Sequence, residues 1–283
     1  PHILDPKHPG IIESVIELSA YWDEAGLQAN RDAVRTTAQK KGFYFRRAYG
    51  YLRLARQIDA EHEVYIEETG ALDKAGLNRI AAKLIQDLFP DGISTGRSPR
   101  ERHLFASAIT PQGIVNHLPT LVEGLHQRVW VRGGIGYSLI VNAVLQAAQR
   151  RGYDTEVYHC ALDPKRIDHV IIPQLGIAVC KASEPYDLVL GNGDRLVNTA
   201  DYLDDNRLEP FSSELAHLRQ VFQEMLAEAI RMIQRAREEH AYIESLYTPH
   251  MNFGRLERRR EQVLEEILGL AKSSERITGC RSE

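Results

Sequence analysis

The chain has 283 residues, of which 43% are hydrophobic and 26% are charged, and its formal net charge is −4. This length and apolar content are enough for two ordinary cores, or for one and a half copies of a duplicated unit. The slightly negative charge argues against a general nucleic-acid-binding role, because contact with phosphate backbones requires a basic surface.

The sequence shows no secretory-signal pattern and no apolar run long enough to cross a bilayer. Its three cysteines lack both a pairing pattern and metal-ligand spacing, which is typical of a reducing compartment. We therefore expect a cytoplasmic protein without a membrane partner.

Residues 1–92 are predicted to form a helical arm. A proline-free stretch, 23–68, reads as one long helix, and a turn at 69–72 leads to a second helix at 73–88 with apolar residues at helical spacing. We expect these two helices to fold back on each other as an antiparallel hairpin.

Residues 93–190 are predicted to form an α/β domain, and residues 191–283 a second helical arm. The α/β domain is expected to hold a parallel sheet, because apolar runs alternate with a helix at 139–151 that serves as a crossover. In the second arm we expect helices at 211–247 and 252–270. The predicted strands are 103–108, 128–131, 155–159, 170–172 and 175–180.

A glycine-rich turn follows the predicted strand at 128–131. It contains Gly133, Gly134 and Gly136, and Tyr137 and Ser138 then open the helix. Such a turn directs backbone N–H groups and a helix N-terminus at an anion, so its geometry favours phosphate. The alternative is a plain tight connection within a parallel sheet.

The turn departs from the P-loop pattern of glycine, four residues, glycine, lysine and serine or threonine. Counted back from Ser138, the lysine position holds Tyr137 and the first glycine position holds Val131. The missing ammonium group is the one that neutralises charge during phosphoryl transfer. We therefore expect ATP to bind at Gly133, Gly134, Gly136, Tyr137 and Ser138 weakly or not at all, and we assign no catalytic residue.

Two acidic residues follow predicted strands, as the Mg²⁺-binding carboxylates of phosphoryl-transfer enzymes do. Asp163 and Asp168, together with Ser138, are therefore the candidate metal ligands. The alternative is a capping or loop role, since Asp163 followed by Pro164 is typical of an N-cap and the first helical position.

The chain resembles the bacterial tandem P-loop ATPase-like proteins of spore-forming species. The resemblance is carried by HLFASAITPQG (103–113), TEVYHC (155–160), Asp163-Pro164, IDHVIIPQLGIAV (167–179) and SEPY (183–186). It implies an α/β fold with a P-loop NTPase-like parallel sheet and long inserted helical hairpins, and ATP and Mg²⁺ as ligands. In that family the loop carries the lysine, so Val131 and Tyr137 are departures.

The two arms also resemble each other. YWDEAGL (21–27) is echoed by YLDDNRL (202–208), Tyr65 is matched by Tyr242, and Leu77 is matched by Leu256. Because the order is kept and the spacing is nearly constant, we interpret this as a tandem duplication in which the first copy lacks its α/β half. Residues 1–10 are then expected to expose apolar surface, which favours self-association.

Three functional hypotheses follow. The first is a degenerate P-loop module with a regulatory or scaffolding role. The second is an ATPase or nucleotide kinase whose working loop lies in an α/β unit ahead of residue 1. The third is an interaction module that binds a protein partner, or a second copy, through its helical arms.

Overall fold

The computed structural model describes residues 8, 10, 11, 13–89, 95–183, 191 and 193–279, with side chains up to residue 271. The chain divides into two compact units, one made of residues 1–42 and 236–283 and the other of residues 43–235. The boundaries of these two units differ from those of the three predicted segments, because the first unit combines residues from both ends of the chain. The predicted boundary at 92/93 lies outside the described residues, as does most of the predicted apolar surface at 1–10.

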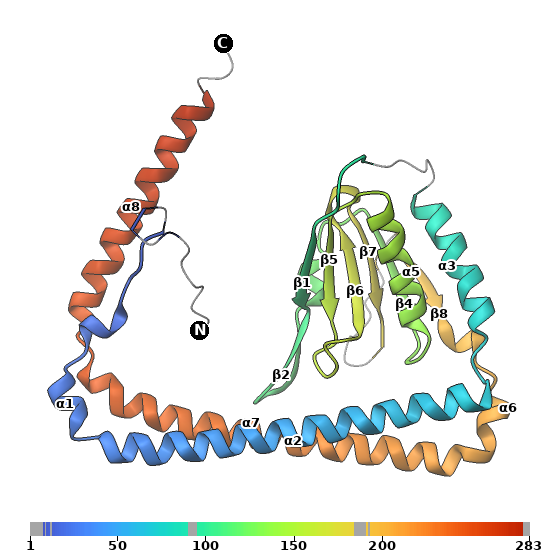
Figure 1. Ribbon diagram of the computed structural model, residues 1–283, viewed down its shortest axis with the longest axis horizontal. Helices are drawn as coiled ribbons and strands as arrows, with labels where there is room; N and C mark the ends of the chain where they lie inside the picture. Colours follow the sequence, from blue (N-terminus) through green and yellow to red (C-terminus); the bar gives the residue numbers. More distant parts are fainter. Residues whose placement is uncertain are drawn as a thin grey trace. The chain divides into compact units, whose positions relative to one another are not determined.

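Residues 43–235 contain a six-stranded sheet (Figure 1). Among its described strands, β6 alone is antiparallel to both neighbours. The connection after β6 is a 3-10 turn, η2 (Pro173–Leu175), followed by Gly176, and so short a link joins antiparallel strands only. The sheet is therefore mostly parallel. In sheet order its strands are β1 (Glu101–Phe105), β5 (Thr155–His159), β6 (Ile167–Ile172), β7 (Ile177–Lys181), β4 (Gln127–Arg132) and β8 (Arg195–Asn198).

Two parts of the β structure differ from the prediction. The predicted strand at 103–108 is divided, because β1 ends before Ala106 and the chain continues into a separate hairpin of β2 (Ser107–Thr110) and β3 (Gly113–Asn116). The edge strand β8 is not predicted at all, since it has four residues and only Val197 among them is buried.

Helices cover both faces of the sheet, so its inner strands are buried along most of their length, and β7 is buried throughout. On one face α5 (Tyr137–Arg150) packs on the strands, and α3 (Lys74–Leu88) packs on α5 through Leu77 and Leu84. On the other face α4 (Leu118–Leu121) contributes to a second cluster with Trp130. Cys160 and Cys180 are buried free thiols at the ends of β5 and β7.

The long helices pair differently from the predicted hairpins. Within residues 43–235, α2 (Arg31–Thr69) lies along α7 (Ser212–Tyr247) (Figure 1). Tyr65 meets Phe211 edge to face at 5.5 Å, and the Arg235 guanidinium lies 5.8 Å from the Tyr44 ring centroid. Helix α3 is predicted to fold back on α2, but it packs on α5 instead. The reason is that the apolar side of α3 packs against apolar residues of α5.

The unit of residues 1–42 and 236–283 is built from short elements around two helix ends. Trp22 and Met251 form an antiparallel bridge, in which the Asp23 N–H donates to the His250 carbonyl at 2.8 Å and the Asn252 N–H donates to the Tyr21 carbonyl at 2.9 Å. The other elements are η1 (Leu18–Tyr21), α1 (Glu24–Gln28), η5 (Thr248–His250) and α8 (Phe253–Gly279).

The same local arrangement occurs within residues 43–235. Leu72 and Leu203 form the bridge, the Asp204 N–H donates to the Ala71 carbonyl at 2.8 Å, and the Asp73 N–H donates to the Tyr202 carbonyl at 2.9 Å. The elements around it are η3 (Thr199–Tyr202), α6 (Asp205–Leu208), η4 (Glu209–Phe211) and α3. In the part of the chain that the structure describes, no helix has the length and apolar character of a membrane span.

Candidate functional site

The glycine loop lies at the carboxyl edge of the sheet, between β4 and α5. Its neighbours end at the same level, since Val131 pairs with Lys181 of β7 and Arg132 pairs with Asn198 of β8. After β4 the chain continues through α5 to β5 on one side, whereas β8 lies on the other side of β4. Ligands of open α/β sheets bind at such a reversal of strand order.

Two of the three loop glycines are required by packing inside the protein. Gly133 has φ +110° and a Cβ there would overlap Thr199 Oγ1, while Gly136 has φ +79° and its Cβ would lie 2.6 Å from Leu77 Cδ1. Gly134 has neither constraint, because its φ is not positive and no atom lies within 4 Å of the place of a Cβ. Gly134 is therefore the loop glycine that packing does not require.

Tyr137 occupies the lysine position and faces the interior. Its hydroxyl donates to Asp168 Oδ1 at 2.6 Å, and Lys181 Nζ lies 5.0 Å from the centroid of its ring. Burial raises the pKa of Tyr137, and the neighbouring Asp168 carboxylate raises it further. The group at this position is thus a buried neutral phenol, which supplies no cation to the loop.

Arg166, just ahead of β6, is an unpredicted part of this edge. Its guanidinium donates to Asp59 Oδ2 and to Glu63 Oε1, both at 2.8 Å, so α2 is anchored against the start of β6. Burial opposes the charge of Arg166, but Tyr137, Asp59 and Glu63 outweigh it and raise the pKa of Arg166. The guanidinium therefore stays charged and bound to the helix.

The three candidate metal ligands have separate surroundings. Asp163 forms an ion pair with Arg56 at 3.2 Å and accepts the Lys165 N–H, whereas Asp168 accepts the Tyr137 hydroxyl, and Ser138 is half-buried in the first turn of α5. Across the described residues, no cluster of three or more His, Cys, Asp or Glu side chains has the geometry of a metal site.

Sequence patterns did not reveal the roles of Arg166 and Lys181. Their proximity to Tyr137 depends on the β6–β7 turn and on the path of α2, and neither is encoded by a local motif. The one available signal was that both are charged residues at the end of a predominantly buried strand.

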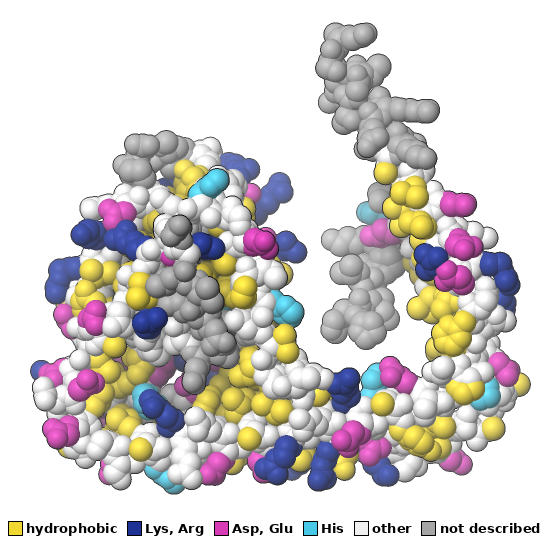
Figure 2. Space-filling view, turned by 180° about the vertical axis from the view of Figure 1, so that it is seen from behind, with side chains coloured by type: hydrophobic (Ala, Val, Ile, Leu, Met, Phe, Trp, Pro, Cys, Tyr) yellow, Lys and Arg dark blue, Asp and Glu magenta, His cyan; other side chains and the backbone are white. Residues whose placement is uncertain are grey.

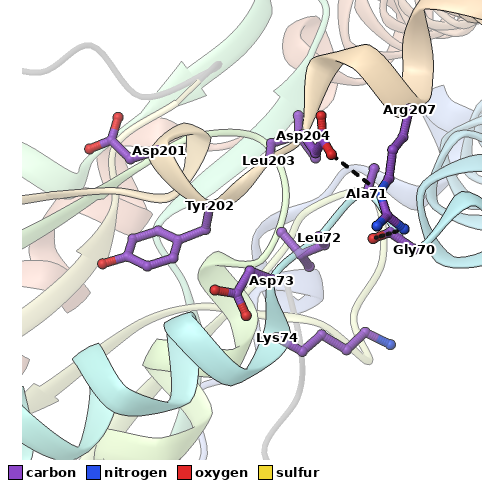
Figure 3. A pocket seen from close by; sticks show the side chains of 10 residues that line it. All are labelled: Gly70, Ala71, Leu72, Asp73, Lys74, Asp201, Tyr202, Leu203, Asp204 and Arg207. Atoms are coloured by element: carbon purple, nitrogen blue, oxygen red, sulfur yellow. Dashed lines mark hydrogen bonds and ion pairs between the residues drawn. The ribbon is translucent and has the colours of Figure 1, made fainter.

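A polar hollow of about 500 Å³ lies next to the loop (Figure 3). Leu72 lines it and also lies 3.4 Å from the place of a Gly136 Cβ. Its charged groups already hold the junction together: Lys74 pairs with Glu67 at 2.8 Å, and Arg207 donates to the Thr69 carbonyl at 3.2 Å. Ten residues line the hollow, namely Gly70, Ala71, Leu72, Asp73, Lys74, Asp201, Tyr202, Leu203, Asp204 and Arg207.

Two carboxylates that line the hollow also stabilise the junction, because they cap helices. Asp73 caps α3 by accepting the Gly76 N–H at 2.8 Å, and Asp204 caps α6 by accepting the Asn206 N–H at 3.2 Å. These contacts tie together the start of α3, the end of α2 and α6. The charged groups that line the hollow are thus bonded to the helix ends around it. The glycine loop therefore remains the candidate site.

Comparison with other proteins gives no further guide to this site. No family model matches the chain, and neither the curated proteins nor the solved structures yield a significant match.

Proposed function

We propose that this protein is a degenerate P-loop NTPase-like module that binds nucleotide weakly or not at all and has a regulatory or scaffolding role. The observation that carries the proposal is the position of Tyr137. Its side chain turns into the core and donates to Asp168, so the place of the phosphate-contacting lysine is filled by a neutral group bound elsewhere.

The expected effect of the missing lysine on the rate of phosphoryl transfer can be estimated from electrostatics. Loss of one preorganised contact to the charge that develops in a transition state costs about 3–4 kcal/mol, or roughly a hundred- to a thousand-fold in rate. Two of the nearby charged groups are engaged in holding the fold, since Arg166 binds α2 and Asp163 binds Arg56. This supports a protein that does not transfer phosphoryl groups at this loop.

What remains at the loop is a weak anion site. The N-terminus of the 14-residue helix α5 presents unsatisfied N–H groups and the positive end of its dipole. The unobstructed approach at Gly134 lets a phosphate reach them. Without the lysine of the P-loop pattern, we expect Mg-ATP to bind no tighter than about 1 mM, a binding free energy of about −4 kcal/mol.

The test is a calorimetric titration with Mg-ATP and with inorganic phosphate, paired with an assay of ATP hydrolysis. Gly134→Ala should abolish any binding, because the added methyl group occupies the approach. The matched control is Gly254→Ala in α8, where the new Cβ would lie 3.7 Å from Asn252 Oδ1. Micromolar binding, or Mg²⁺-dependent hydrolysis that Ser138→Ala removes, would overturn the proposal.

A further inference from the structure

One apolar surface in the unit of residues 1–42 and 236–283 is left uncovered (Figure 2). Its first part is the chain just ahead of η1, where Val15 is 66% exposed. Its second part is one side of α8, where Ile267 is 56% exposed, and η1 and α8 pack on each other. The two parts thus belong to elements that contact each other. Its exposed apolar members are Val15, Ile16, Leu18, Leu264, Ile267 and Leu268.

Residues 43–235 contain the counterpart of this surface. Aligning YWDEAGL (21–27) with YLDDNRL (202–208) places residues 14–17 on β8, η1 on η3 and α1 on α6. Aligning Leu77 with Leu256 in the same way places the start of α3 on the start of α8. The Trp22–Met251 bridge then falls on the Leu203–Leu72 bridge. The correspondence thus holds in order, in element type and in hydrogen bonding.

The counterpart surface is covered. Val197 of β8 is 9% exposed because β8 pairs in parallel with β4. Leu84 and Leu88 of α3 are 0% and 7% exposed because α5 packs on them. In α8 the corresponding residues, Val263 and Ile267, are also apolar, and within the part of the chain that the structure describes no long helix packs along α8 as α5 packs along α3.

We propose that residues 14–17 and the exposed side of α8 are the docking surface for an α/β unit of the type that residues 101–198 form. The partner adds a strand parallel to residues 14–17, as β4 lies beside β8. Its crossover helix packs on Leu256, Val263, Leu264, Ile267 and Leu268, as α5 packs on α3. A chain segment that corresponds to strand β8 and an apolar helix side, presented together, fit such a unit better than a single helix.

The same comparison shows why this partner is not the chain's own α/β unit from a second copy. That unit already has β8 and α3 in place. In addition, the positions of Ile80 and Ala81 in α3 are taken by Arg259 and Arg260 in α8, which pair with Glu266 and Glu257. The partner helix must therefore offer polar groups where α5 meets apolar residues. The proposal goes beyond the proposed function, because it does not depend on phosphate binding.

The test uses the full chain with a second copy of residues 95–194 inserted between Glu13 and Ser14, here called the extended chain. It also carries Arg259→Ile and Arg260→Ala, so that α8 matches α3 at these two positions. Hydrogen exchange should slow by at least about tenfold at Val15, Ile16 and along α8, relative to the unextended chain with the same two substitutions. Adding Leu264→Lys and Ile267→Lys to the extended chain should remove the new protection of α8.

Three results would overturn the proposal. The first is unchanged exchange at Val15 and Ile16 in the extended chain. The second is an added unit that stays unfolded, since residues 14–17 and α8 would then fail to replace β8 and α3. The third is a dimer of the unmodified chain that Ile267→Lys dissociates, which assigns the surface to a second copy. None of these measurements involves nucleotide, so they stand apart from the test of the loop.

Discussion

The phenol of Tyr137 has a structural consequence that can be measured. Its hydroxyl gives the buried Asp168 carboxylate a hydrogen bond of 2.6 Å, and Asp168 is 1% exposed. Removal of one partner of a buried charge-assisted hydrogen bond leaves the other under-solvated. The side chain at the lysine position therefore stabilises the fold.

Tyr137→Phe should lower the free energy of unfolding by about 1–3 kcal/mol without changing the urea m-value. The matched control is Tyr158→Phe, which removes a 2.8 Å hydrogen bond to Glu156, a residue in contact with solvent, and should cost about 1 kcal/mol or less. Equal losses in the two variants would show that the Asp168 contact has no special weight.

Acid should weaken the fold through His169 of β6. Burial lowers the pKa of His169 to about 3, with Lys181 lowering it and Asp168 opposing the shift. The unfolded chain takes up a proton below the ordinary value of about 6.5 while the folded chain does not. The contribution of neutral His169 is therefore complete above about pH 6.5 and is lost as the pH falls toward 3.

In urea titrations between pH 6.5 and 4, the wild-type chain should lose up to about 1.4 kcal/mol per pH unit more than His169→Gln. Gln has no titrating group, so the difference between the two curves isolates the imidazole. Parallel curves over this range would contradict a neutral buried His169.

At the scale of elements, the loop between β4 and α5 contains two glycines that the fold requires, Gly133 and Gly136, and one that it does not require, Gly134. Gly136→Ala should lower the melting temperature by several degrees, because Ala at φ +79° costs roughly 1–2 kcal/mol and its Cβ would crowd Leu77. Gly134→Ala should leave the melting temperature within about 1 °C, since surface changes without such constraints are nearly neutral. Equal melting temperatures for the two variants would refute this division.

The first position of the P-loop pattern also changes meaning in the structure. Val131 is fully buried within β4, between β7 and β8, so it is a core residue of a strand and not part of the turn. Val131→Gly should cost about 2 kcal/mol or more in unfolding free energy, from lost burial and a cavity. An unchanged urea midpoint would show that this position tolerates the pattern's glycine.

Sequence patterns identified the elements whose signal is local. The predicted strand at 155–159 coincides with β5, and the predicted helix at 211–247 matches α7 within one residue. The failures are non-local: β8 is too short and polar to show a pattern, and the partner of α3 is α5, which begins only after four intervening strands. At the loop, the sequence identified Tyr137 as anomalous, but only the packing shows that it faces Asp168.

On the scale of the whole molecule, burial is unevenly shared between the two units. Every apolar residue of the two core clusters lies within residues 43–235. Of the described residues in the other unit, Thr37 and Ala236 are buried, while α8 is largely exposed. Local stability follows the density of buried apolar contacts.

Native-state hydrogen exchange should therefore show the amides of α1 and α8 opening at much lower free energy than those of β4, β7 and α5. The comparison can be made within one sample, residue by residue. Uniform protection across both units would indicate that the α8 surface is already covered in solution.

The buried thiols of the sheet can be used to measure how often the sheet opens, by their rate of alkylation. Cys180 in β7 is 1% exposed, and burial raises the pKa of its thiol, so little thiolate exists while the strand stays paired. Cys160 lies at the end of β5 and is also buried. In a Cys280→Ser chain, an alkylating reagent can then modify Cys180 only when β4, β6 and β7 separate. The labelling rate of Cys180 itself therefore measures how often the strands next to the glycine loop separate.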